Sequence, residues 1–274
     1  MKSPLSIRQL LSLVLFIALP AFLAGQSNQP DNGFVPEVGQ DGKDVIWVPT
    51  PQELVDTMLA IAKVTADDFV IDLGSGDGRT VITAAKKGAK AIGIEYNPEM
   101  VSLSKKNAEK EGVSKRTEFI EADLFEYDFS KATVITMFLL PEINLKLRPR
   151  LLELKPGTRI VSNTFTMGEW EPDYEVETED NWNSWNTALM WIVPAKVDGS
   201  WMMGTDELNI RQVYQILHGN LKSGGKSLLI DGRMNGNEIS FKVNDTLYTG
   251  NVEGNKITGT VNSKGRVSSW SASR

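Results

Sequence analysis

Short apolar runs alternate with amphipathic stretches along the first two thirds of the chain. Apolar runs with the length of buried strands lie at 69–73, 89–94, 117–120, 132–136 and 159–162. Stretches with helical spacing of apolar positions lie at 54–62, 80–87, 97–111 and 143–154, and Pro149 should kink or break the last of them. This alternation predicts a parallel sheet with helical crossovers.

The pattern changes near residue 174. Residues 174–178 and 187–193 are strand-like, which predicts an antiparallel hairpin at the edge of the sheet. Trp182 and Trp185 flank its tip, where aromatic side chains either pack against the sheet edge or grip a substrate. From residue 196 onward, short β-like runs are joined by Gly and Asn turns, which predicts a small antiparallel β domain, either a meander or an open barrel.

The N-terminus has the pattern of a targeting segment. Lys2 and Arg8 precede an apolar run at 10–19, and small residues follow at 24–25. We expect residues 1–25 to be a secretory signal peptide or, if uncleaved, an N-terminal anchor that is the protein's contact with a membrane. Residues 26–45 read as a flexible linker. The expected location is therefore outside the cytosol, in the periplasm or on an outward-facing membrane surface.

Charge and composition exclude several kinds of substrate and catalytic group. The 274 residues carry a net charge of −6, with 17 basic and 28 acidic residues in 26–195 but 10 basic and 7 acidic residues in 196–274. The acidic balance of 26–195 argues against a nucleic-acid substrate, because phosphate binding needs basic side chains. The chain has no cysteine and one histidine, His218, so thiol nucleophiles and multi-histidine metal sites are excluded and no metal site is expected.

A glycine-rich turn joins the first strand to the next helix. Asp72-Leu-Gly-Ser-Gly-Asp-Gly-Arg79 leaves free N–H groups at a helix start and lets a ligand approach the backbone. Such a turn alone is also common as a tight structural connection. Two further acidic residues add to it: Glu95 ends the second strand and Asp123 follows the third. We therefore expect Asp72, Glu95 and Asp123 to share the carboxyl edge of the sheet, where open α/β sheets bind ligands.

Three carboxylates suit S-adenosylmethionine (SAM) better than a dinucleotide. One carboxylate can offset the positive charge of the SAM amino group, a second can accept hydrogen bonds from the ribose hydroxyls, and a third can accept one from the adenine amine. The pyrophosphate of a dinucleotide would instead be repelled by Asp72. The glycine spacing, Gly74-x-Gly76-x-Gly78, also differs from the dinucleotide pattern Gly-x-Gly-x-x-Gly.

Four motifs together resemble the bacterial class I SAM-dependent methyltransferases: Val48-Pro-Thr-Pro51, the turn 72–79, Gly93-Ile-Glu-Tyr-Asn-Pro98 and Asp123-Leu-Phe125. They are most similar to the branch related to the lysine methyltransferases that modify the ATP synthase c-ring protein. The resemblance covers the expected methyltransferase domain, 46–195, and leaves 196–274 as the separate β domain. It implies an α/β, Rossmann-like sheet of seven strands with an antiparallel edge, and transfer of a methyl group from SAM, with a protein lysine as a candidate acceptor. A small-molecule acceptor stays open beside it.

The motifs supply the candidate site residues. The candidates for SAM binding are Asp72, Gly74, Ser75, Gly76, Asp77, Gly78, Glu95, Tyr96, Asp123 and Leu124. The candidates for the acceptor pocket are Thr136, Phe138, Pro141 and Thr50, although 138–141 can equally be a packed helix entry. No catalytic residue is assigned. The alternative hypothesis, prompted by the export signal, is an exported SAM-binding or scaffolding protein that keeps the fold without turnover.

Overall fold

The computed structural model describes residues 33–43, 46–179 and 185–274. The predicted signal peptide, residues 26–32 and 44–45 of the predicted linker and Trp182 lie outside the described residues, so the expectations on them stay predictions. Among the described helices, none is long and apolar enough to cross a membrane.

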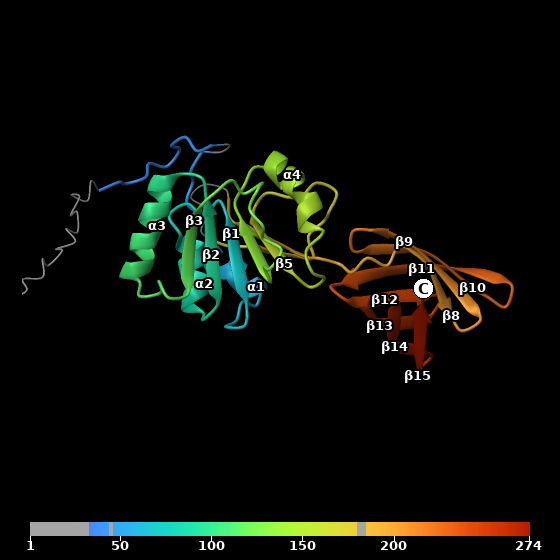
Figure 1. The fold of residues 1–274 in the computed structure, drawn as a ribbon. Coiled ribbons are helices and arrows are strands. Elements are labelled where there is room, and N and C mark those ends of the chain that lie inside the picture. The colour runs from blue at the N-terminus through green and yellow to red at the C-terminus, as the bar shows by residue number, and fades with distance from the viewer. Residues whose placement is uncertain (1–32, 44–45, 180–184) are drawn as a thin grey trace, which may run out of the picture. The chain divides into compact units, whose positions relative to one another are not determined.

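The first part of the fold is a seven-stranded sheet in the order β3-β2-β1-β4-β5-β7-β6 (Figure 1). Its strands are β1 (Phe69–Leu73), β2 (Lys90–Glu95), β3 (Thr117–Glu121), β4 (Val134–Met137), β5 (Arg159–Asn163), β6 (Tyr174–Glu177) and β7 (Thr187–Ile192). The first five are parallel, whereas β7 runs antiparallel to β5 and pairs with β6 as a hairpin. The predicted α/β class and antiparallel edge are confirmed.

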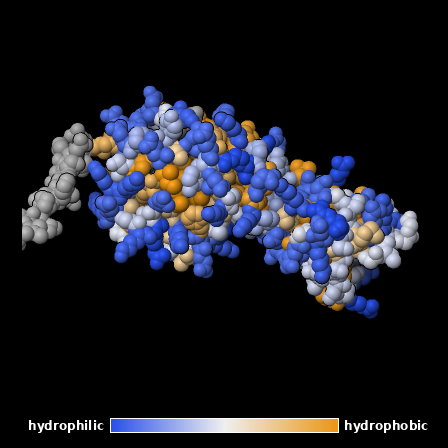
Figure 2. Space-filling model, in the orientation of Figure 1, coloured by the Kyte–Doolittle hydropathy of each residue, from blue (hydrophilic) through white to orange (hydrophobic). Residues whose placement is uncertain are grey.

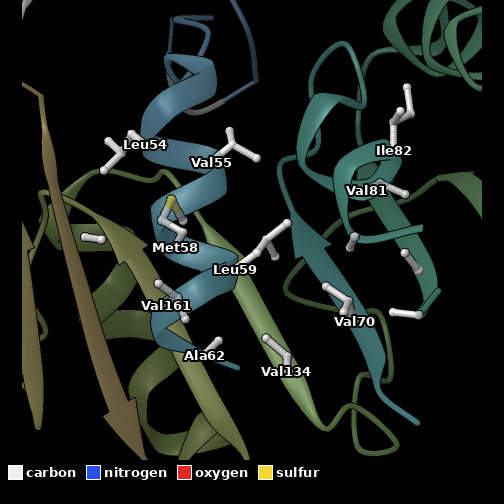
Figure 3. Packing of buried hydrophobic residues seen from close by; sticks show 14 of the residues in the cluster. Leu54, Val55, Met58, Leu59, Ala62, Val70, Val81, Ile82, Val134 and Val161 are labelled. Atoms are coloured by element: carbon white, nitrogen blue, oxygen red, sulfur yellow. The ribbon is translucent and has the colours of Figure 1, made fainter. Parts of the chain in front are cut away.

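Helices cover both faces of this sheet. They are α1 (Gln52–Ile61), α2 (Arg79–Lys86), α3 (Pro98–Lys110) and α4 (Pro141–Leu151). Alternate strand residues point to opposite faces, so Val70 packs in the same core cluster as α1, α2 and α3, and Ile71 in the cluster that contains α4. Figure 3 shows Leu54, Met58 and Leu59 of α1 beside the strands that carry Val134 and Val161.

Of the two effects predicted at Pro149, a kink or a break, the break is absent. α4 continues to Leu151, and Leu147 and Leu151 on either side of the proline are fully buried. Pro149 stands in the last turn of the helix, so it interrupts the hydrogen bonding of only that turn while the burial of two leucines holds the helix against the sheet.

The C-terminal part is a closed eight-stranded antiparallel barrel. Its strands are β8 (Gly199–Met203), β9 (Asp206–Val213), β10 (Ile216–Ser223), β11 (Lys226–Asn235), β12 (Glu238–Val243), β13 (Thr246–Glu253), β14 (Lys256–Ser263) and β15 (Arg266–Ser273). The sequence predicts an antiparallel domain without distinguishing a meander from an open barrel. Closure comes from β15, which reaches β8 through the pair Ser273–Met202.

The barrel has a core of its own. Trp201 and Phe241 are almost fully buried in it, and Trp270 stands edge-on to Phe241 with ring centroids 5.5 Å apart. Hydrophilic side chains dominate the visible surface of the molecule, and hydrophobic ones show through mainly over the sheet (Figure 2).

Candidate active site

A large pocket opens at the carboxyl edge of β1, β2 and β4. The residues 40–43 and 46–50 ahead of α1 line one side, and the glycine-rich turn and the ends of β2 and β3 line the next. Residues that follow β4 and β5, together with Trp185 before β7, line the remaining side. The pocket therefore lies where the topology of open α/β sheets places ligands.

The glycine-rich turn is held in an open conformation by its neighbours. The N–H groups of Gly74 and Ser75 both donate to the carbonyl of Ile94, at 2.9 and 3.0 Å. Gly76 has a φ of +53°, and a Cβ added to it would lie 2.7 Å from Trp47 Nε1. Ser104 of α3 donates to the carbonyl of Gly76 at 2.7 Å. The turn thus favours glycine at position 76 for two reasons. A positive φ is unfavourable for residues with a side chain, and the indole of Trp47 stands where a Cβ would lie.

Asp72 is buried at the base of the pocket. The residue is 5% exposed, and its carboxylate accepts a hydrogen bond from Thr136 Oγ1 at 2.6 Å, across the β1–β4 ladder. Burial raises the pKa of Asp72 to about 7, the bond from Thr136 opposes that rise, and the nearby carboxylates of Glu95 and Asp77 add to it. A cationic group bound here would favour the ionised carboxylate.

Glu95 connects the second strand to the glycine-rich turn. Its Oε2 accepts from the N–H of Gly76 at 2.9 Å, and its Oε1 accepts from the N–H of Asn97 at 3.0 Å. Asn97 in turn caps α3 by accepting from the N–H of Glu99. Because each carboxylate oxygen has two lone pairs, Glu95 keeps the capacity to accept from a pair of hydroxyl groups.

Asp123 lines the pocket just after β3 and forms an ion pair with a lysine. Lys43 Nζ is 2.5 Å from Asp123 Oδ2, and the N–H of Phe125 donates to Oδ1 at 2.8 Å. The hydrogen bond from Lys43, followed by that from Phe125, lowers the pKa of Asp123. The same ammonium group stands 4.7 Å from the ring centre of Tyr96.

Arg79 at the start of α2 links three segments around the pocket. It forms an ion pair with Asp77, with Nη2 2.6 Å from Oδ2, and donates from Nη1 to the carbonyl of Thr50 at 2.8 Å. The hydroxyl of Thr50 accepts from Asn163 Nδ2 at 3.3 Å. A guanidinium beside a helix N-terminus is suited to an anionic group such as a carboxylate.

Three aromatic side chains form one wall of the pocket, defined as Phe138, Phe165 and Trp185. The rings of Phe138 and Phe165 are stacked with centroids 5.8 Å apart, and Trp185 stands at 64° to Phe138 with centroids 5.7 Å apart. Each of the three is partly exposed. This aromatic wall adds an apolar surface to a pocket that also contains carboxylates.

The structure gathers most of the predicted site residues in this one pocket. Asp72, Gly74, Ser75, Gly76, Asp77, Glu95, Tyr96, Asp123, Leu124, Thr50 and Phe138 line it. Gly78, Thr136 and Pro141 do not. Gly78 precedes α2 with its Cα facing Phe119, Thr136 is fully buried against Asp72, and Pro141 begins α4.

Sequence reasoning missed Lys43, Trp47, Arg79 and Phe165 as lining residues. Phe165 follows β5 by two residues, so the argument from strand ends that finds Glu95 and Asp123 would find it too. For Trp185, the sequence leaves packing at the sheet edge and contact with a substrate open. Lys43 stands in the predicted linker, where no sequence signal marks it.

The residues of the pocket fit SAM. Ser75 Oγ is buried in the pocket wall without a hydrogen-bond partner, which leaves a polar atom for a ligand to satisfy. Glu95 and Asp123 offer acceptors to hydroxyl and amine groups, and Asp72 offers a negative charge to a cation. Among the described residues, no group of three or more His, Asp or Glu side chains is arranged to hold a metal ion.

Comparison with known proteins agrees with this fit. Residues 72–174 match the family model described as the ANTKMT methyltransferase domain. The chain is 47% identical over 152 residues to a protein-lysine N-methyltransferase of Saccharolobus islandicus, which covers 54% of this chain and 94% of that protein. It is 35% identical over 105 residues to the mouse adenine nucleotide translocase lysine N-methyltransferase, 38% of this chain and 46% of that protein.

Among solved structures, the fold is similar to that of a protein of Salinibacter ruber described as an RNA methyltransferase in complex with S-adenosylhomocysteine. The identity is 48%, the TM-score 0.52, and the match covers 55% of this chain and 96% of that one. The chain thus covers nearly all of the archaeal and Salinibacter proteins but less than half the length of the mouse relative.

Proposed function

This chain belongs to the family of SAM-dependent methyltransferases that includes the Saccharolobus islandicus enzyme, and we propose that its methyl acceptor is the side-chain amine of a protein lysine. The expected family, methyltransferase activity and SAM cofactor are confirmed by the match to this family and by the Salinibacter structure with S-adenosylhomocysteine. None of these relatives supports the alternative of a scaffolding protein without turnover.

The observation that carries the lysine assignment is 47% identity over 94% of a protein-lysine N-methyltransferase. The pocket agrees with it, because the aromatic wall suits the long apolar stem of a lysine and the carboxylates suit its amine. A small-molecule acceptor has no such support from a relative and stays an outcome of the test.

Within the pocket, we assign the SAM groups to the residues whose chemistry matches them. The negative charge of Asp72 would pair with the amino group of SAM, and Arg79 with the start of α2 would bind its carboxylate. Glu95 would accept hydrogen bonds from the ribose hydroxyls, and Asp123 would accept one from the adenine amine. When bound, SAM supplies a methyl group already activated on a positively charged sulfur. The chain therefore has to hold the acceptor amine in line with that methyl and keep water away from it.

A lysine amine must be neutral before it can attack. Its proton has to pass to water or to a carboxylate of the pocket, since the only histidine, His218, lies on β10 of the barrel. Residues Phe138 and Trp185 would cover the stem of the lysine while the amine points toward the carboxylate side of the pocket.

One observation favours a second candidate, an RNA acceptor, because the Salinibacter protein is described as an RNA methyltransferase. The charge of residues 26–195, with 28 acidic against 17 basic residues, disfavours it.

The N-terminal pattern of Lys2, Arg8 and the apolar run 10–19 supports export of the chain. We therefore place the expected acceptor among envelope proteins.

The test uses the purified full-length protein and SAM labelled in its methyl group. Envelope and cytosolic fractions of the source cells are the acceptors, and each product is divided into samples treated with protease or with nuclease. We expect label in a protein of the envelope fraction that survives nuclease and appears as methyl-lysine after acid hydrolysis. The Glu95→Ala variant should transfer no label.

Each other outcome has a defined meaning. Label that nuclease releases would establish the RNA candidate and overturn the lysine acceptor. Label in material that survives both treatments would identify a small molecule. Label confined to a cytosolic protein would keep the lysine acceptor and overturn the proposed location.

A further inference from the structure

The loop 164–173 contacts the pocket at one end and the barrel at the other. It joins β5 to β6, and its second residue, Phe165, lines the pocket. The loop then turns back on itself, so that the fully buried Met167 and Trp170 pair as a β-bridge. Residues 35–274 form one compact unit, within which the later residues of the loop contact the barrel. One short segment thus carries both a pocket residue and the contacts to the C-terminal domain.

Helix α4 holds the pocket end of this loop. Buried Asn144 donates from Nδ2 to the carbonyls of Phe165 and Thr166, at 3.1 and 3.2 Å. Arg148 donates from Nη1 to the carbonyl of Met167 at 2.7 Å. Because residues four apart lie on the same face of a helix, α4 holds the loop at two successive points.

The barrel holds the other end with the two-residue turn between β9 and β10. The ring of Tyr214 is stacked on Trp170, with centroids 5.9 Å apart and planes at 13°. The centre of the same ring lies 5.5 Å from the guanidinium carbon of Arg148. Gln215 is 2% exposed and donates from Nε2 to the carbonyl of Glu171 at 2.7 Å. Tyr214 therefore contacts both the loop and the arginine that holds its other end.

The turn that presents Tyr214 is held by hydrogen bonds within the barrel. Tyr214 has a φ of +52°, the left-handed conformation that two-residue hairpin turns favour. Its carbonyl accepts from Gln212 Nε2 at 2.8 Å. The carbonyl of Gln215 accepts from the N–H of Met234 on β11 at 2.7 Å. The direction of the Tyr214 ring is thus set by the barrel.

We propose that Tyr214 is a positioning residue for the acceptor. Through Trp170 and Arg148 it holds the loop 164–173, and the loop holds Phe165 in the aromatic wall that suits the stem of the acceptor lysine. The inference rests on the proposed function for the choice of acceptor. It gives a role to the barrel, which begins after residue 174, where the match to the family model ends.

The two sides of the pocket distinguish this role from a general effect on folding. The loop contributes Phe165, whereas Asp72, Glu95 and Asp123 belong to the segments of β1, β2 and β3. Coupling through packed side chains acts on the groups that they contact. Loosening the loop should therefore weaken the hold on the acceptor and leave the affinity for the donor side unchanged.

The first test compares three variants of the full-length protein. Tyr214→Ala removes the ring and Tyr214→Phe keeps it. Lys264→Ala is the matched control, because exposed Lys264 opens another two-residue turn of the barrel, between β14 and β15, with a φ of +50°. The acceptor is the cell fraction that takes up label from the wild-type enzyme, titrated at saturating labelled SAM.

We expect Tyr214→Ala to raise the apparent KM for the acceptor about 2-fold to 10-fold, the range of one lost aromatic contact. Its Kd for S-adenosylhomocysteine, measured by calorimetry, should stay within about twofold of the wild-type value, a smaller change than the KM shows. Tyr214→Phe and Lys264→Ala should match the wild type in both. An unchanged KM, or an equal loss of S-adenosylhomocysteine affinity, would overturn the proposal.

The second test needs no acceptor. The full-length protein is produced with 4-fluorophenylalanine and saturated with S-adenosylhomocysteine, and the fluorine resonance of Phe165 is identified by its absence in Phe165→Leu. We expect Tyr214→Ala to shift or broaden this resonance and Lys264→Ala to leave it in place. The wild-type resonance in both variants would show that Tyr214 does not position Phe165.

The two proposals fail in different ways. If the wild-type enzyme labels no lysine, the proposed acceptor is wrong, and the fluorine spectra still decide whether Tyr214 positions Phe165. If the wild-type enzyme labels lysine but Tyr214→Ala keeps the wild-type KM, the lysine acceptor stands and the role of Tyr214 is overturned, whether or not the resonance of Phe165 moves.

Discussion

Lys43 Nζ lies 2.5 Å from Asp123 Oδ2, so the carboxylate that we assign to the adenine amine already has a cationic partner from the segment ahead of α1. The side chain of Lys43 is 35% exposed, which makes the pair accessible to solvent and to salt. Its positive charge offsets part of the negative charge that Asp72, Asp77 and Glu95 bring to the same pocket.

Replacing Lys43 by methionine should therefore change how the enzyme discriminates between SAM and S-adenosylhomocysteine. SAM carries one more positive charge than its product, so we expect the ratio of SAM affinity to S-adenosylhomocysteine affinity to rise about twofold to fivefold at low ionic strength. Titration calorimetry at two salt concentrations measures the ratio. Lys90→Met, which removes the same charge from the first residue of β2, is the control, and an equal effect in both variants would contradict the prediction.

The raised pKa of Asp72 predicts a dependence of stability on pH. Between the ordinary value of 3.8 and about 7, the folded protein keeps a proton on Asp72 that the unfolded chain has lost. The contribution of Asp72 to the free energy of unfolding therefore falls as pH rises through this window, by up to roughly 4 kcal/mol.

Asp72→Asn should remove this contribution, because the amide oxygen still accepts from Thr136 and carries no charge. Urea unfolding of the ligand-free protein from pH 4 to 8 should show a flatter pH dependence for the variant, and higher stability than the wild type at pH 8. Parallel curves for the two proteins would show that Asp72 titrates normally.

Gly76→Ala should weaken the binding of S-adenosylhomocysteine by at least about tenfold. The added Cβ would lie 2.7 Å from Trp47 Nε1, so the indole or the turn must move. Gly112→Ala is the matched control, since Gly112 also has a positive φ, of +72°, but has no atom within 4 Å of an added Cβ.

A second substitution identifies the cause of that loss. Trp47→Ala in the Gly76→Ala background should restore part of the affinity if the indole is the obstacle, as a double-mutant cycle measured by calorimetry would show. No recovery would assign the loss to the backbone angle at position 76.

Arg274, which directly follows β15, should stabilise the barrel. Its guanidinium donates to the carbonyls of Asp198 and Lys196, at 2.8 and 3.1 Å, and stands 4.4 Å from the ring centre of Trp201. We expect Arg274→Ala to lower the free energy of unfolding by about 1–2 kcal/mol. Arg274→Lys should recover only part of it, because lysine lacks the planar fork. Denaturant unfolding followed by tryptophan fluorescence measures both, and equal stability of all three proteins would contradict the prediction.

The sequence predicts the sheet because its central strands β1, β2, β4 and β5 lie in short, mainly apolar runs. The predicted runs 69–73 and 159–162 differ from β1 and β5 by no more than one residue, and the hairpin at 174–193 was also found. The closure of the barrel was not predictable, since it depends on contact between β8 and β15, which are separated by six other strands. Local hydrophobic patterns do not encode that contact.

In the candidate site, too, some residues could be predicted from the sequence and others could not. Asp72, Glu95 and Asp123 line one pocket because each ends or follows a parallel strand, a relationship that chain order alone supplies. Phe165 reaches the pocket through the left-handed backbone of Thr164, and Trp185 through the reversed direction of β7. The strand-end position of Phe165 and the predicted antiparallel hairpin mark both segments, but no pattern in the sequence shows the positive φ of Thr164. Thr136 was expected in the acceptor pocket, but its place opposite Asp72 in the ladder turns its hydroxyl to that carboxylate.

The order of strands in the sheet separates the two halves of the pocket along the chain. The segments around β1, β2 and β3 carry the carboxylates, and those around β4, β5 and β7 carry the aromatic wall. Substitutions in the second set leave the first in place as long as they spare Thr136, which donates to Asp72, and Asn163, which donates to Thr50. The side of the pocket that faces the methyl donor and the side that faces the acceptor are therefore encoded in consecutive stretches of the chain, and each can be exchanged as one block.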